Sequence, residues 1–488
     1  MRLFPIGTLM DEVKLKTART LKWNTIDKFA SQALYAVTGI VLANIVSQEQ
    51  YGLIGAIWAF QAIATLLIDS GFSNALVQRK NPTDTDYSTV FWFNTTMSVG
   101  LYAALWFAAP FIDALFHAGG QLIPLCRVTF CAIIINALSI VQANRRIKQM
   151  NVKMIAYSDI IGLVISSVVG LTLAFKGYGA WAIVWQVIAL ATTKTVILWA
   201  SSNWLPKLTF SWTSLKSIFA VGSGVMCSAF LNTIFQDIYS FIIGNRFTLA
   251  QLGCYTQADK WSKMGIAPLS SILTTSFLPV LSDCQDSHEV FLNRMHKASR
   301  LSAYIYMPGL LGIALVAPAL FHILFSDKWD NAVILFQILA LRGIFTVSTS
   351  IYNNYMLAKG RSKRLVESEV VKDLLIVLAI VLSLPYGITW LVAGQLIAGA
   401  VYWLYAAWLT SRTVDCTIWS LVKGGLVYLF IAAIACVPAL ALTTFIRSPW
   451  ILLPAQVGTI IVVYTTINAL LHSVIQQDIF NYIRKKQM

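Results

Sequence analysis

The sequence is poor in charged residues, and this scarcity excludes several classes of protein. Charged residues make up 12% of the 488 residues and hydrophobic residues 57%, whereas a soluble domain carries about 25% charged residues. So little charge disfavours a soluble enzyme, a nucleic-acid binder and a disordered protein. The seven cysteines are scattered, with no pair at metal-ligand or CxxC spacing. We therefore interpret them as small buried hydrophobic residues and expect no metal site.

Motifs of chemistry and targeting are also missing. The first 23 residues are polar and basic, without an apolar core or a cleavage site, so we expect no cleavable signal peptide. A phosphate-binding loop motif is absent, which argues against ATP-driven transport. The predicted outer loops are short and offer no catalytic domain. The sequence therefore predicts a protein that is not an enzyme, binds no cofactor and acts within the membrane.

Long apolar runs fill the chain instead, and about 20 such residues suffice for a helix to span a bilayer. Fourteen candidate spans lie near 24–46, 51–71, 87–109, 122–142, 155–175, 180–201, 216–244, 251–281, 300–325, 331–357, 370–388, 391–411, 420–443 and 450–472. With the N-terminus inside, 25 of the 36 Lys and Arg residues fall on the cytoplasmic side, four outside and seven within spans. This asymmetry predicts an all-α polytopic membrane protein with both termini in the cytoplasm.

Three short patterns of the first half recur in the same order in the second half. They are Ala43-Asn44 with Tyr51-Gly52, Ala109-Pro110 and Tyr178-Gly179, which match Gly244-Asn245 with Leu252-Gly253, Ala317-Pro318 and Tyr386-Gly387. Six spans separate equivalent points, which predicts two six-helix lobes of the same topology with substrate between them. The predicted organisation is a cytoplasmic segment 1–23, an N-lobe 24–201, a linker 202–215, a C-lobe 216–411, two extra helices in 412–472 and a basic tail 473–488.

Polar side chains mark equivalent faces of the first and seventh spans. Asp27 and Ser31 share a face at i, i+4 spacing, with Lys28 and Gln32 beside it. The seventh span has the equivalent stripe Ser228, Asn232 and Gln236, with Asp237 adjacent. Polar residues within spans are costly and usually face a cavity or a partner. We expect these faces to line a substrate cavity.

Seven cations lie within spans, and they suit an anionic substrate such as a phosphate or diphosphate. They are Lys28, Arg127, Lys194, Lys260, Lys263, Arg342 and Lys372. We assign Lys260, Lys263 and Arg342 to the cavity, although Asp259 and Lys263 could instead form a structural ion pair. Residues near span ends could simply extend toward the interface, and Lys194 has no assigned partner. Asp69, Asp237 and Asp259 are candidates for coupling transport to H+ or Na+.

Several blocks of the sequence resemble a known family. They are Ala43-Asn44-Ile45-Val46-Ser47, Tyr51-Gly52-Leu53-Ile54-Gly55, Ile68-Asp69-Ser70-Gly71-Phe72-Ser73-Asn74-Ala75, Ser88-Thr89-Val90-Phe91-Trp92-Phe93-Asn94, Leu252-Gly253-Cys254-Tyr255-Thr256-Gln257-Ala258-Asp259 and Ala358-Lys359-Gly360-Arg361-Ser362. Over nearly the whole chain they resemble the Wzx/TuaB-type polysaccharide (lipopolysaccharide O-unit) flippases of the multidrug/oligosaccharidyl-lipid/polysaccharide exporter superfamily.

The resemblance implies a bacterial inner-membrane flippase with a cationic cavity lined by helices 1, 2, 7 and 8. Such a protein moves undecaprenyl-diphosphate-linked oligosaccharide from the cytoplasmic to the periplasmic leaflet by alternating access between its lobes. Its partners would be the lipid-linked oligosaccharide, membrane lipids and the polysaccharide polymerase and chain-length machinery, with no nucleic acid. The alternatives are an ion-coupled multidrug exporter of the same superfamily, a membrane-embedded glycan polymerase or ligase, and a scaffold protein.

Overall fold

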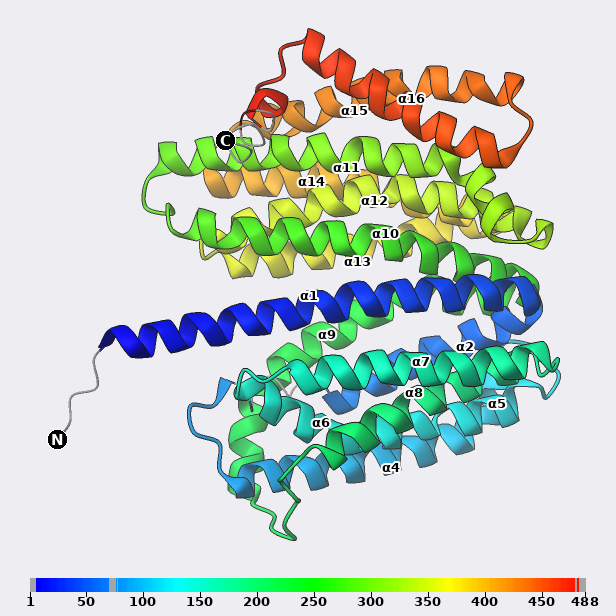
Figure 1. The fold of residues 1–488 in the computed structure, drawn as a ribbon, viewed down its shortest axis with the longest axis vertical. Helices are drawn as coiled ribbons and strands as arrows, with labels where there is room; N and C mark the ends of the chain where they lie inside the picture. Colours follow the sequence, from blue (N-terminus) through cyan, green and yellow to red (C-terminus); the bar gives the residue numbers. More distant parts are fainter. Residues whose placement is uncertain (1–5, 70–75, 77, 479–480, 482–488) are drawn as a thin grey trace. The chain divides into compact units, whose positions relative to one another are not determined.

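The described part of the chain is helical throughout, without a strand, in a computed structural model (Figure 1). It describes residues 6–69, 76, 78–478 and 481, and their side chains except those of 6–19, 21, 69, 220–228 and 274–275. The helices are α1 (Ile6–Ile45), α2 (Gln48–Asp69), α4 (Asp84–Leu115), α5 (Leu122–Thr129), α6 (Cys131–Lys148), α7 (Lys153–Phe175), α8 (Ala180–Ala200), α9 (Trp212–Arg246), α10 (Leu249–Ser282), α11 (His288–Leu324), η1 (Asp327–Trp329), α12 (Asp330–Ala358), α13 (Ser362–Ser383), η2 (Leu384–Tyr386), α14 (Ile388–Val414), α15 (Ile418–Phe445) and α16 (Pro449–Leu470).

The expected all-α polytopic membrane fold is confirmed. Each of the fourteen apolar stretches falls on a helix, and the fourth is divided between α5 and α6. Within the described residues, eleven stretches are helices long and apolar enough to cross a membrane. The three remaining helices, α1, α9 and α13, carry the polar and charged positions noted in the sequence. The protein is therefore a multi-pass membrane protein.

The chain divides into two compact units, Met1–Gly253 and Cys254–Met488, with the division inside α10. In the first unit, α7 packs against both α1 and α8, and α9 packs against α2. In the second unit, α11 packs against α12, α15 and α16, and α14 packs against α12 and α13. The second core is rich in aromatic residues with polar tips, such as Tyr306, whose hydroxyl lies 2.6 Å from that of Ser348. The lobe boundaries expected from the repeat remain a prediction.

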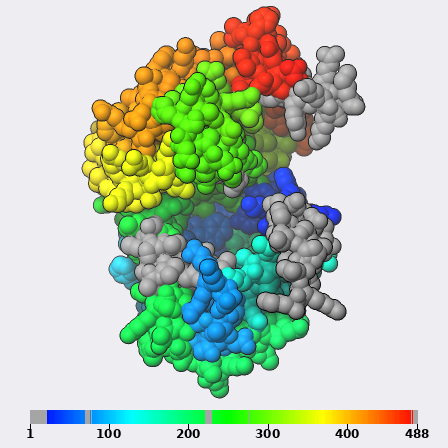
Figure 2. Space-filling view, turned by 90° about the vertical axis from the view of Figure 1, so that its left-hand side faces the viewer, coloured from blue at the N-terminus to red at the C-terminus, as the bar shows by residue number. Residues whose placement is uncertain are grey.

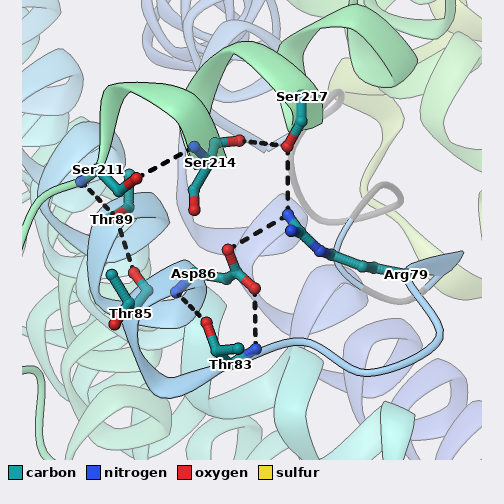
Figure 3. A network of polar contacts seen from close by, with 8 residues as sticks. All are labelled: Arg79, Thr83, Thr85, Asp86, Thr89, Ser211, Ser214 and Ser217. Carbon is teal, nitrogen blue, oxygen red and sulfur yellow. Dashed lines mark hydrogen bonds and ion pairs between the residues drawn. The ribbon is translucent and has the colours of Figure 1, made fainter.

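A polar network fixes the start of α9 against α4 in the first unit (Figure 3). Thr83 and Asp86 form a capping box at the N-terminus of α4, in which each side chain bonds to the backbone N–H of the other residue. The Asp86 carboxylate, whose side chain is 1% exposed, also lies 3.2 Å from the Arg79 guanidinium. Arg79 in turn donates to the Ser217 hydroxyl of α9 at 3.2 Å. One buried carboxylate thus links three segments of chain.

The N-terminal turns of α2 and α10 cross in direct backbone contact. A Cβ atom at Gly52 would lie 1.9 Å from the carbonyl oxygen of Leu249. A Cβ atom at Gly253 would lie 1.9 Å from the carbonyl oxygen of Gln48. The two glycines hold matching positions in the repeat, so the contact is reciprocal. Only residues without a side chain allow the two backbones to approach so closely.

We predict that Gly253→Ala destabilises the protein, because the added methyl group forces two backbones apart. The cost should be about 1–3 kcal/mol, as for other overpacked sites. Gly100→Ala is the matched control, since nothing lies within 4 Å of a Cβ atom at that helical position, and alanine there should be neutral or stabilising. Thermal unfolding of the purified variants measures the difference. Equal melting temperatures for the two variants would show that the crossing is not tight.

Candidate functional site

A cluster of charged side chains lies in the first unit among α1, α7 and α8. The Ser31 hydroxyl donates to the Asp27 carboxylate at 3.0 Å, one turn along α1. The charges of Asp159, Lys194 and Lys28 act on the same half-buried carboxylate. Of the four residues predicted on this helix, Asp27, Ser31 and Gln32 are half-buried, whereas Lys28 is exposed.

The sequence alone indicates no partner for Lys194. In the structure it pairs with Asp159, which the sequence did not single out. Its Nζ lies 2.6 Å from Oδ1 of Asp159, and both side chains are largely shielded. Close packing of α7 on α8 makes this possible, because the backbone of Lys194 passes 3.8 Å from a Cβ atom placed at Gly162. The available signal was the position of Asp159, an acid near the start of an otherwise apolar span.

A polar cleft of about 580 Å³ opens between α2, α8 and α9 in the same unit. Its walls are Trp58, Gln61, Ala62, Thr65 and Leu66 of α2, Val187 of α8, and Thr233, Gln236 and Asp237 of α9. The structure therefore brings two predicted residues, Gln236 and Asp237, to a cleft. The Gln236 amide also donates to Asn232 at 3.3 Å along the predicted stripe of α9. The side chain of Ser228 lies outside the described residues, as does that of Asp69.

Gln61, Thr65 and Thr233 are the polar residues of the cleft that the sequence did not reveal. Gln61 offers a buried Oε1 that has no hydrogen-bond partner within the described chain. A buried acceptor without a partner is costly, so it marks a place where a donor from a ligand or from water is required. Near the cleft, Phe60, Phe116 and Phe241 pack edge-on or tilted with ring centroids 6.0–6.3 Å apart. They close the neighbouring space between α2, α4 and α9 with apolar surface.

The second unit holds the remaining predicted cations. Lys263 pairs with Asp259 at 2.7 Å across one turn of α10, which realises the structural ion pair allowed by their spacing. The Lys260 ammonium lies 5.4 Å from the centre of the Trp261 ring. Arg342 of α12 lies against Gly399 of α14. Its Nε is buried without a hydrogen-bond partner among the described residues, so Arg342 is the one of these three predicted cations best able to bind an anion.

These arrangements suit binding and transport. The cleft has amide, hydroxyl and carboxylate groups that hydrogen-bond to sugar hydroxyls, and the half-buried carboxylate of Asp27 could bind a proton or a small cation. In the described residues, no group of three or more His, Cys, Asp or Glu side chains could hold a metal ion. Whether Asp27, Lys28, Arg342 and the other predicted residues touch a substrate stays a prediction.

The chain is similar in sequence to proteins of polysaccharide biosynthesis and in fold to a solved membrane transporter. A family model described as "Polysaccharide biosynthesis protein" matches residues 41–334. The teichuronic acid biosynthesis protein TuaB of Bacillus subtilis (strain 168) is 24% identical over 70% of this chain and 71% of its own length. The lipopolysaccharide biosynthesis protein WzxC of Escherichia coli (strain K12) is 22% identical over 75% of each chain. The fold resembles the lipid II flippase MurJ in an inward closed conformation, with a TM-score of 0.73, 16% identity, and coverage of 92% of this chain and 98% of that one.

We predict that Lys194→Met destabilises the protein more than the double variant Lys194→Met/Asp159→Asn. The single variant leaves the Asp159 carboxylate without its paired cation, whereas the double variant removes charge of both signs. The difference should be about 1–3 kcal/mol for this partly shielded pair, measured by thermal unfolding in detergent. Lys207→Met is the control, because its 3.9 Å contact with Asp84 is solvent-exposed. Equal stability of the single and double variants would contradict the pairing.

Proposed function

Because the chain belongs to the polysaccharide biosynthesis protein family, we propose that it is a flippase for lipid-linked oligosaccharides. It moves an oligosaccharide carried on a polyprenyl diphosphate across the membrane for assembly of a surface polysaccharide. Two relatives bear the names of teichuronic acid and lipopolysaccharide biosynthesis proteins, and the shared fold is that of a lipid II flippase. All three names concern glycans of the bacterial cell envelope.

The polar cleft of the first unit is the observation that carries the proposal. Moving a hydroxyl into hydrocarbon without a partner costs about 4–8 kcal/mol, so an oligosaccharide cannot cross a bilayer unaided. Gln61, Thr65 and Gln236 place amide and hydroxyl groups in a cleft among membrane helices, where they can replace the water around a sugar. The polyprenyl tail needs no such replacement and stays in lipid.

The diphosphate needs cations, and each unit supplies a candidate. Lys28 is exposed beside Asp27 in the first unit, and Arg342 in the second has a buried guanidinium nitrogen without a partner in the described chain. Lys263 is already held by Asp259, and Lys260 lies near an aromatic ring. We therefore assign the diphosphate to Lys28 and Arg342 before Lys260 and Lys263. Arginine suits this role because its planar group can bind two phosphate oxygens at once.

The remaining features of the proposal follow from the distribution of charge and from the relatives. The protein resides in the bacterial inner membrane with both termini in the cytoplasm, as the basic segments indicate. It exposes its cleft alternately to the two sides and performs no covalent chemistry. A polymerase and chain-length machinery on the outer side would consume the delivered oligosaccharide.

We place the coupling of transport to H+ or Na+ at Asp27. Asp259 is occupied by Lys263, whereas Asp237 lines the cleft, where it can contact substrate. Asp27 is half-buried, bonded to Ser31 and surrounded by charges of both signs. Loading Asp27 with a cation changes the balance of these charges.

Loss of the protein should make lipid-linked oligosaccharide accumulate in the cytoplasmic leaflet. Restoring the wild-type gene should restore export, whereas Gln61→Leu/Gln236→Leu should lower the rate about 5- to 150-fold, because two hydrogen bonds of about 0.5–1.5 kcal/mol each are lost. Lectin binding to surface glycan measures export, and the amount of extracted lipid-linked oligosaccharide measures its accumulation.

The matched control is Gln149→Leu/Gln477→Leu, which makes the same chemical change at exposed positions outside the cleft. It should export normally. Unchanged export by Gln61→Leu/Gln236→Leu at normal membrane levels would show that the cleft is not the substrate path. Absence of the accumulated intermediate after gene deletion would overturn the substrate class itself.

Asp27→Asn should uncouple transport from its driving ion. In proteoliposomes, an imposed pH or Na+ gradient should accelerate translocation by the wild-type protein and have no effect on the variant. Asp283→Asn, at an exposed position, should respond like the wild type. If Asp27→Asn retained the full response to both gradients, the coupling site would lie elsewhere.

A further inference from the structure

A second pocket, independent of the transport cleft, lies in the second unit where α11 and α15 begin and α16 ends. Its volume is about 720 Å³, and Figure 2 looks onto this end of the helices, with α11 in green, α15 in orange and the end of α16 in red. Both α15 and α16 lie beyond residue 334, where the family match ends. The proposed flippase function gives this pocket no role.

The pocket wall is strongly cationic. Lys297 and Arg300 occupy one face of the third and fourth turns of α11, and Lys423 belongs to the second turn of α15. Lys297 is neutralised by Asp478 at 2.6 Å. For Arg300 and Lys423 no ion pair is found among the described residues. Two positive charges therefore remain uncompensated, and His296 and His472 of the same wall add further nitrogen donors.

Close packing of α11 against α15 brings Arg300 next to the helix that carries Lys423. A Cβ atom at Gly424 would lie 3.1 Å from Cγ of Arg300, so the arginine stem crosses α15 at a residue without a side chain. The Thr417 side chain caps α15 by accepting from the N–H of Ser420, and both residues line the pocket. The positive end of the α15 dipole thus adds to the field of the two cations.

A buried acceptor completes the polar wall. Asn468 of α16 is fully buried and donates its amide N–H to the carbonyl of Tyr464 at 2.9 Å. Its Oδ1 has no hydrogen-bond partner in the described chain. A ligand with an anionic group for the cations and a hydroxyl for Asn468 would satisfy both parts of this wall.

The rim of the pocket is apolar and exposed. Trp419, Leu471 and Val474 are each more than 60% exposed, and Val427 begins a series of exposed apolar residues along α15. That series continues with Phe430, Ile434, Val437 and Leu440. In a membrane helix such a surface faces lipid chains, so a ligand with a charged head in the pocket could extend its apolar part along α15.

We propose that this pocket binds the phosphate of an anionic ligand, and that the source is the headgroup of a membrane phospholipid with a free hydroxyl, such as phosphatidylglycerol. Basic pockets between membrane helices on the basic side of a protein commonly hold such headgroups. The bound lipid would join α11 to α15 and α16. It would tie the two helices outside the repeat to the rest of their unit.

The test uses the purified full-length protein and native mass spectrometry after incubation with an equimolar mixture of phosphatidylglycerol and phosphatidylcholine of matched chains. The wild type should retain phosphatidylglycerol preferentially. Arg300→Gln/Lys423→Gln should reduce that preference about tenfold or more, because two cations near the headgroup are lost. Arg361→Gln/Lys363→Gln removes the same charge from exposed positions outside the pocket and should behave like the wild type.

A second arm replaces the lipid with inorganic phosphate and follows thermal unfolding. Stabilisation by phosphatidylglycerol but not by phosphate supports the lipid source, whereas equal stabilisation by phosphate that depends on Arg300 and Lys423 would overturn it. An unchanged lipid preference in the Arg300→Gln/Lys423→Gln variant would overturn the site. If that variant cannot be purified, the single variants Arg300→Gln and Lys423→Gln test the same site. Each should lose part of the preference for phosphatidylglycerol.

Discussion

The ion pair between the buried carboxylate of Asp86 and the partly exposed Arg79 is the interaction on which the first unit depends. Asp86 sits almost without solvent contact at the start of α4, and its partner reaches across to α9 through Ser217. In surroundings of low polarity, an unpaired carboxylate would be far more costly than a paired one. Through Ser217, the pair holds the first turns of α9 against the start of α4. The position of α9 in turn decides whether Gln236 and Asp237 face α2 across the cleft.

The sequence predicted those features that depend on a single helix. Apolar run length located all fourteen stretches because a membrane helix must satisfy its backbone internally. Spacing of three or four residues also suggested that Asp259 could pair with Lys263, and that Ser31 shares a face with Asp27, because such neighbours lie on one helix surface. The sequence did not predict contacts between side chains of different helices. The pair Lys194–Asp159 depends on the packing of α7 on α8 at small residues such as Gly162. The placement of Gln61 and Gln236 in one cleft depends on the packing angle between α2 and α9.

Charge serves different purposes in different parts of this protein. Partly shielded pairs such as Arg79–Asp86 and Lys194–Asp159 position helices, and each pairs a cation with a carboxylate. Cations for which the described residues provide no counter-ion, such as Arg342 and Arg300, are instead the candidates for binding a ligand. Net charge alone does not distinguish the two kinds. The two kinds differ in whether a carboxylate lies within ion-pair distance of the cation.

The pairing of Lys194 with Asp159 also determines the electrical character of the group around Asp27. With Asp27 ionised, its charge and those of Lys28, Asp159 and Lys194 add to zero. If Asp27 takes up one proton or one Na+, as we propose for coupling, this neutral group gains a single positive charge. Moving such a charge through the full membrane potential changes its energy by about 2.3 kcal/mol per 100 mV. A voltage alone, without an ion gradient, would then shift the balance between the loaded and the empty protein.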